Sequence, residues 1–173
     1  MSSTESRRLL RHFLAALAYR TQKAVRDAPP GYAESRLTAT SRSPRELVWH
    51  MAGLMGYART FFHGGAYRPQ ALPTFEAEIA RFHEQLASLG EDLADPSLRC
   101  SISDEQLLQG PLADAMTHAG QLAMLRRFVG DPVPSENFIF ARVDASNLGA
   151  HQPLPAAPDA WWSADQGHRP PGE

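Results

Sequence analysis

Residues 111–127, PLADAMTHAGQLAMLRR, place an acid and an imidazole one helical turn apart among apolar side chains. On a helix that advances about 100° per residue, His118 lies at the centre of the apolar face and Asp114 lies beside it. An ionised carboxylate on a buried face costs several kcal/mol unless a partner compensates its charge. A carboxylate and an imidazole at this spacing can bind a divalent metal or form a local ion pair.

A second imidazole occupies an apolar helical face in an earlier segment, LVWHMAGLMGYARTFF. Gly53 and Gly56 remove side-chain bulk close to His50, although glycine is disfavoured inside helices, and this favours a small cavity there. If the two helices pack side by side, His50, Asp114 and His118 can converge on one point. Two nitrogens and one oxygen would leave a fourth position open, which is the ligand number of a catalytic zinc or a related divalent site.

Simpler explanations exist for each of these residues alone. A single histidine on an apolar face is more often a hydrogen-bonded core residue than a ligand, and Asp114 with His118 could form an ion pair near a helix start. Gln121 and Tyr57 lie on the same faces as the histidines and are candidates for contacts to the ligands or to a substrate. Their simpler alternatives are a polar boundary position for Gln121 and apolar packing for Tyr57.

Four segments show the helical period, and we expect helices near residues 4–27, 44–63, 75–93 and 111–130. Ser43, Pro44 and Glu46 supply a cap, a first-turn proline and a capping-box glutamate for the second helix. Gly110-Pro111 is expected to open the fourth helix. Short connections, including residues 64–73, predict an all-α, antiparallel four-helix bundle with the second and fourth helices adjacent.

The chain of 173 residues fits one domain, which we expect to consist of a bundle over residues 1–132 and an extension over residues 133–173. After residue 130 the chain holds seven of its fourteen prolines, so no long helix is expected there. The apolar pair Trp161-Trp162 predicts that the extension packs on the bundle at least that far. The last residues, 163–173, are expected to be mobile.

Composition excludes several functional classes. The formal net charge of −2 and a pI of about 6.4 give no electrostatic reason to expect nucleic acid or an anionic membrane as a partner. Cys100 is the only cysteine, which excludes an internal disulfide and a thiolate metal cluster. The sequence shows neither a signal-peptide core nor an apolar stretch of about 18 residues. We therefore expect a cytoplasmic protein.

The segments RSPRELVWHMAGLMGYA and DAMTHAGQLAMLRR resemble the DinB/YfiT-like superfamily, and the resemblance covers most of residues 4–130. It implies a four-helix bundle that binds a divalent metal through a histidine of the second helix and an HxxxH pair of a later helix. His50 and His118 correspond to the first and last of these ligands. Asp114 replaces the other histidine, at a position where the related mycothiol-dependent maleylpyruvate isomerases have a glutamate. The implied ion is zinc, with nickel, iron or manganese as alternatives.

The resemblance also implies an activity. Characterised relatives include bacillithiol and mycothiol S-transferases, so we expect a metal-dependent transfer of a low-molecular-weight thiol to an electrophilic small molecule. Hydrolysis by metal-activated water is the alternative reaction. The alternative class is a non-catalytic, ligand-binding bundle with a vestigial metal site, which the unusual Asp114 favours. A homodimer is implied by the superfamily, and the apolar residues expected to be exposed on the first and third helices give it weak support. The other histidines are expected at the surface: His12, His63, His83, His151 and His168.

Overall fold

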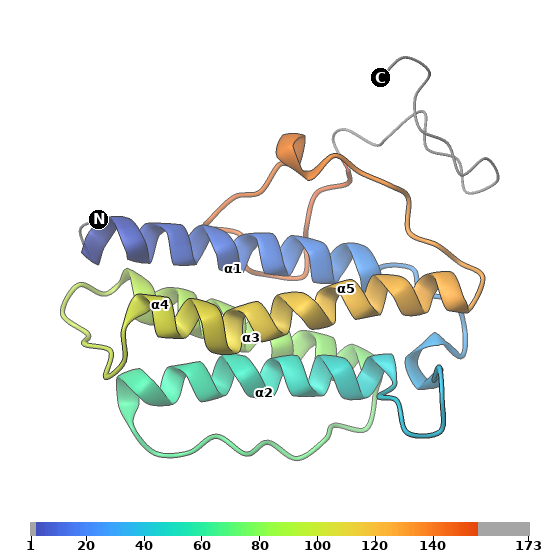
Figure 1. Ribbon diagram of the computed structural model, residues 1–173, viewed down its shortest axis with the longest axis horizontal. Coiled ribbons are helices and arrows are strands. Elements are labelled where there is room, and N and C mark those ends of the chain that lie inside the picture. Colours follow the sequence, from blue (N-terminus) through green and yellow to red (C-terminus); the bar gives the residue numbers. More distant parts are fainter. Residues whose placement is uncertain (1–2, 156–173) are drawn as a thin grey trace.

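The computed structural model describes residues 3–155, and four long helices packed side by side make up most of this part (Figure 1). The long helices are α1 (Ser3–Val25), α2 (Pro44–His63), α3 (Phe75–Ala94) and α5 (Ala113–Phe128). The short helical elements are η1 (Tyr32–Glu34), α4 (Asp104–Leu107), η2 (Leu108–Leu112) and η3 (Phe138–Phe140). Residues 3–155 contain no β-strand. The predicted all-α fold with four packed helices is therefore confirmed.

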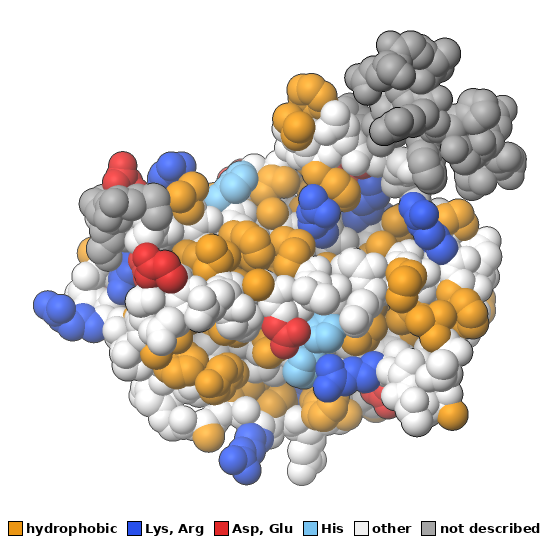
Figure 2. All heavy atoms as spheres, in the orientation of Figure 1, with side chains coloured by type: hydrophobic (Ala, Val, Ile, Leu, Met, Phe, Trp, Pro, Cys, Tyr) orange, Lys and Arg blue, Asp and Glu red, His pale blue; other side chains and the backbone are white. Residues whose placement is uncertain are grey.

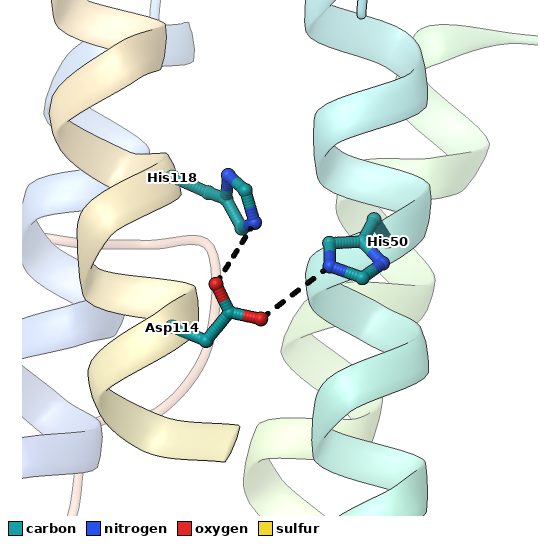
Figure 3. Close-up of side chains that lie close together, drawn as sticks. All are labelled: His50, Asp114 and His118. Atoms are coloured by element: carbon teal, nitrogen blue, oxygen red, sulfur yellow. Dashed lines mark ion pairs between the residues drawn. The ribbon is translucent and has the colours of Figure 1, made fainter. Parts of the chain in front are cut away.

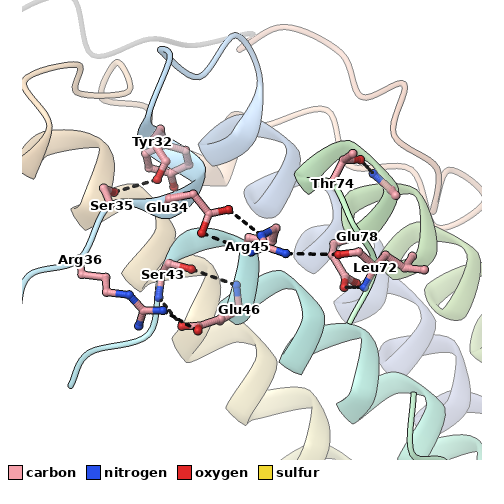
Figure 4. A network of polar contacts seen from close by, with 11 residues as sticks. Tyr32, Glu34, Ser35, Arg36, Ser43, Arg45, Glu46, Leu72, Thr74 and Glu78 are labelled. Atoms are coloured by element: carbon pink, nitrogen blue, oxygen red, sulfur yellow. Dashed lines mark hydrogen bonds and ion pairs between the residues drawn. The ribbon is translucent and has the colours of Figure 1, made fainter. Parts of the chain in front are cut away.

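Capping side chains fix the starts of α2 and α3. The Ser43 side chain accepts a hydrogen bond from the backbone N–H of Glu46, and the Glu46 carboxylate accepts one from the Ser43 N–H at 2.9 Å. Pro44 occupies the first turn, where no backbone donor is needed. The Thr74 hydroxyl accepts from the Ala77 N–H at 3.1 Å (Figure 4). These bonds satisfy helix-end donors that otherwise lack partners, so both starts agree with the sequence.

The α2 and α3 helices run in the same direction, which differs from the antiparallel direction expected for this pair. Near their starts, Arg45 donates to the Leu72 carbonyl oxygen at 3.3 Å, just before α3 begins (Figure 4). Near their ends, Nε of Arg59 lies 2.8 Å from Oδ2 of Asp92. The connection over residues 64–74 allows this because eleven extended residues reach about 36 Å, whereas a 20-residue helix is about 30 Å long. The small number of residues in this connection therefore does not imply a tight turn.

Each of the four long helices contacts two others: α1 and α2 each pack against both α3 and α5. The contact between α2 and α5 confirms the predicted neighbourhood of the second and fourth helices. Fully buried side chains from all four helices form one core, including Leu14, Leu17, Met51, Met55, Phe82, Leu86 and Leu122. The α2–α5 seam is the part of the bundle that positions the candidate metal ligands.

The fourth predicted helix begins earlier than expected and is interrupted. Ser103 and Gln106 form a capping box at the start of α4. Gly110-Pro111 does not open a helix but lies inside the π-helical segment η2, where Gly110 has a ψ of −107°. Pro111 has no N–H to donate, and a wider π turn accommodates that loss. As a consequence, Asp114 lies in the first turn of α5, directly after this irregular segment.

The chain after α5 packs on the bundle through buried polar contacts. The buried Glu136 carboxylate accepts from the Tyr19 hydroxyl at 2.5 Å and from Lys23 Nζ at 2.8 Å. Leu148 packs over Gly90, where an added Cβ would lie 2.3 Å from the Leu148 Cδ1 atom. Trp161, Trp162 and the tail expected to be mobile lie outside the described residues. No helix in residues 3–155 has both the length and the hydropathy of a membrane span.

His83 is buried, contrary to the surface position expected for it. Its Nδ1–H donates to the Leu148 carbonyl oxygen at 2.8 Å, and its Nε2 lies 3.2 Å from Oε1 of Gln22. The helical pattern of α3 alone could not reveal this, because the covering segment is distant in sequence. His12, His63 and His151 are exposed, as expected, and His168 lies outside the described residues.

We predict that His83 makes folding sensitive to mild acid. Burial lowers its pKa, and the hydrogen bond to Leu148 offsets part of this effect. Below about pH 6.5 the unfolded chain therefore takes up a proton that the folded chain resists, so the free energy of unfolding falls as pH decreases. His83→Gln should reduce the loss of stability between pH 7.5 and pH 5.5, measured by urea unfolding. His12→Gln, at an exposed position, should retain the wild-type loss, and an equal loss in all three proteins would contradict the prediction.

Candidate metal centre

Three potential ligands meet where α2 and α5 face each other. His50 lies on α2, His118 lies on α5, and the Asp114 carboxylate lies between the two imidazoles (Figure 3). Oδ1 of Asp114 is 3.2 Å from Nε2 of His118, and its Oδ2 is 3.6 Å from Nε2 of His50. One ligand atom from each residue falls within a set whose members are all within 4.8 Å of one another. The structure therefore brings together all three residues that the sequence singled out.

These separations are close to those of ligands around one ion. For bonds of 2.0 to 2.2 Å, two ligands of a tetrahedral ion are about 3.4 Å apart. The two separations that involve Asp114 lie on either side of this value, although they end on different carboxylate oxygens, Oδ1 for His118 and Oδ2 for His50. The imidazole rings of His50 and His118 are edge to face, with centroids 4.9 Å apart. Two nitrogens and one oxygen fit zinc, and also nickel, iron and manganese.

Gln121 orients His118. Nδ1 of His118 lies 2.8 Å from Oε1 of Gln121, one turn further along α5. An amide oxygen can only accept, so Nδ1 donates to Gln121 and Nε2 is the ring nitrogen left for an ion. Histidines that bind metals in proteins almost always donate their other N–H to such an acceptor. Gln121 therefore lies within hydrogen-bond distance of a candidate ligand, and its role beside the ligands stays a prediction.

Exposure differs strongly among the three side chains. The His118 side chain is 11% exposed and that of His50 is 30% exposed, whereas that of Asp114 is 47% exposed. The expectation that Asp114 sits on a buried face is therefore wrong: its side chain reaches the surface, although Leu112 and Ala115 beside it are fully buried. The carboxylate keeps part of its hydration, and the desolvation cost inferred from the helical pattern does not arise.

The electrostatic surroundings favour a neutral His50. Burial lowers the pKa of the His50 imidazole, the charges of Arg42 and His118 lower it further, and Asp114 acts in the opposite direction. A metal ligand must be the neutral imidazole, so the lowered pKa reduces competition from protons near neutral pH.

A cavity of about 310 Å³ borders the candidate metal centre at His118, which forms part of its wall together with Gln121, whereas His50 and Asp114 do not line it. Figure 2 shows acidic, histidine and basic side chains side by side over α2 and α5, surrounded by apolar side chains. Sequence reasoning missed Leu37, Ser41 and Arg42 of this wall, because they belong to a loop whose position over α5 has no periodic signal.

Near His50, Tyr57 follows the simpler alternative of apolar packing, whereas the expected space beside Gly56 is absent. Tyr57 is exposed, packs edge to face on Phe61 and does not line the cavity at His118. Gly56 does not open space near His50, because an added Cβ would lie 2.2 Å from a ring carbon of Tyr67. Gly56 thus allows the 64–74 connection to pack on α2. At Gly53 an added Cβ would meet nothing within 4 Å, so only this glycine faces open space.

Comparisons with protein-family models, curated proteins and solved structures give no match for this chain. What the structure shares with the DinB/YfiT-like expectation is a four-helix arrangement that brings His50, Asp114 and His118 together. The assignment of the site therefore depends on its geometry.

We predict that His118→Ala abolishes binding of one zinc ion, because two ligands cannot hold the ion tightly. Calorimetric titration of metal-free protein with zinc should show one site in the wild type and none in the variant. The core does not need the ion, so the helical circular dichroism should remain. His12→Ala is the matched control, since it removes an exposed histidine of α1 and should keep the site. Zinc binding by the His118→Ala variant at wild-type affinity would contradict this assignment.

A second prediction concerns Gln121. Gln121→Met keeps the length of the side chain but removes the acceptor for His118, and zinc affinity should fall about 10- to 100-fold. Gln121→Glu retains an acceptor oxygen and should bind zinc close to the wild-type affinity in the same titration. Equal affinities for the Met variant and the wild type would show that the hydrogen bond does not orient the ligand.

Proposed function

We propose that this protein is a divalent-metal-dependent enzyme that transfers a low-molecular-weight thiol to an electrophilic small molecule. The observation that carries the proposal is the convergence of His50, Asp114 and His118 within 4.8 Å, beside a cavity that His118 lines. Zinc is the ion that we propose first, and nickel, iron and manganese are alternatives.

The three residues would occupy only part of a metal coordination shell. Structural zinc sites have four protein ligands, whereas catalytic sites have three and leave a position for water or substrate. The exposed Asp114 carboxylate keeps one side of the site accessible to solvent. A divalent ion in this site would lower the pKa of a thiol or a water molecule at its open position.

The cavity favours a thiol over water as the nucleophile. The described residues that line it include no carboxylate and no imidazole except His118, which is assigned as a ligand. Hydrolysis would therefore lack a neighbouring general base. A thiol starts from a lower pKa than water, so beside a divalent cation it would lose its proton to solvent more readily than water would. Transfer then forms one carbon–sulfur bond, and the leaving group departs with the electron pair of the bond that breaks.

The chain itself contributes ligand orientation and an apolar reaction space. Gln121 holds His118 in the tautomer whose Nε2 faces the site. Leu47 and Leu125 form a buried part of the cavity wall, which limits the access of water to a reacting thiolate. An electrophile placed in this cavity would lie against the same face of the site that His118 borders.

Hydrolysis is the second candidate function, and the exposure of Asp114 favours it, because water can reach the ligands from the surface. A metal ion can lower the pKa of water to about 7, which makes hydroxide available at neutral pH. A non-catalytic site would bind the ion and support neither reaction.

We predict thiol-dependent conjugation of monochlorobimane, a chloro-electrophile that becomes fluorescent when its carbon–chlorine bond is replaced by a carbon–sulfur bond. Bacillithiol, mycothiol, coenzyme A and cysteine are tested with the zinc-loaded protein. At least one thiol should give a rate that chelation abolishes, and His118→Ala should lower that rate about 100-fold or more. Arg68→Gln, on the exposed 64–74 connection, is a charge-loss control and should leave the rate unchanged.

The outcomes separate the candidate functions. A conjugation rate that survives both chelation and His118→Ala would contradict the proposal. Metal-dependent hydrolysis of 4-nitrophenyl acetate without any thiol would favour the second candidate. Zinc binding with neither activity would support the non-catalytic alternative.

A further inference from the structure

The cavity beside the three ligands combines an apolar wall with one fixed positive charge. Leu37, Leu47, Met124 and Leu125 supply its apolar surface, and Arg42 lines it together with His118. Leu37 is 41% exposed and Met124 is 49% exposed, so two large apolar side chains face solvent where the surface is concave. Exposed apolar groups in a hollow next to polar groups are typical of small-molecule sites.

Arg42 differs from the arginines near it in having no acceptor. Arg36 Nη2 lies 2.5 Å from Oε1 of Glu46, and Arg45 Nε lies 2.6 Å from Oε1 of Glu34. The carboxylates of Glu46 and Glu34 are therefore already paired with other arginines, as Figure 4 shows. Arg42 makes no hydrogen bond or ion pair with any described residue, although its guanidinium offers five donors. Its charge is available to a ligand in the cavity.

The charge balance of the region also favours an anionic ligand. Among the described residues that line the cavity there is no carboxylate, and Arg42 is the one permanent charge. Asp114 lies next to His118 and contributes one negative charge, which a divalent ion would more than compensate. With neutral imidazoles, the occupied site and Arg42 together would carry a net charge of about +2.

We propose that this cavity binds a small carboxylate with an apolar body, and that Arg42 determines this specificity. The planar guanidinium forms two parallel hydrogen bonds with a carboxylate, while the apolar body covers the side chains of Leu37 and Met124. This proposal rests on the proposed function in one respect, because it identifies the electrophile that accepts the thiol as a molecule that carries a carboxylate. A cavity of about 310 Å³ is at the lower end of the size of ligand pockets, which fits a single ring or a short chain.

The test measures binding of benzoate and of the neutral, equally sized benzamide by isothermal titration calorimetry, with metal-free and zinc-loaded protein. Benzoate should bind more tightly than benzamide to the wild type. Arg42→Gln should weaken benzoate binding about tenfold or more and leave benzamide binding unchanged, in both metal states. Arg42→Lys keeps the charge but not the planar fork, and should give an intermediate affinity.

Arg68→Gln removes a charge from the exposed 64–74 connection and is the matched control, which should bind benzoate like the wild type. Equal benzoate affinity in Arg42→Gln and the wild type would overturn the inference, and so would benzamide binding as tight as that of benzoate or no measurable binding of benzoate. Zinc titration of the same samples reports separately on the proposed function. Arg42-dependent benzoate binding in a protein that takes no zinc would uphold the cavity and reject the metal centre.

Discussion

The contact of one carboxylate with two imidazoles across the α2–α5 seam is the interaction on which the rest of the site depends. Asp114 lies 3.2 Å from His118 and 3.6 Å from His50, so it links two helices that are distant in sequence. The contact can form only because α2 and α5 are neighbours in the bundle. The Ser43 cap fixes where α2 starts, and the irregular segment η2 fixes where α5 starts.

Local sequence signals predicted the parts of the fold that depend on local interactions. The capping residues Ser43 and Thr74 define helix starts because their side chains bond to backbone donors within three residues. The helical period placed His50 and His118 on inward faces, and adjacency of two helices was then sufficient to bring them together. The exposure of Asp114 was not predictable from the helical period, because the period does not show how much of the apolar face of α5 the neighbouring helices cover.

The parts that sequence reasoning missed depend on contacts between distant segments. His83 is buried by Leu148, and Gly56 receives the ring of Tyr67; neither partner is near in sequence. The direction of α3 depends on whether residues 64–74 turn back or extend, and their number permits both. The capping box at Ser103 is a local signal and could have been found. Gly110-Pro111 is a stronger helix-breaking signal close by, and it obscured this start.

The central claim is that His50, Asp114 and His118 bind one divalent ion. X-ray absorption fine structure of the zinc-loaded protein tests it most directly, because the method reports the ligand types and distances around the ion itself. The account predicts a shell of nitrogen and oxygen atoms at about 2.0 to 2.2 Å, with the outer scattering of two imidazoles and no sulfur from the protein. A shell that contains a single imidazole, none, or a sulfur from Cys100 would contradict the account.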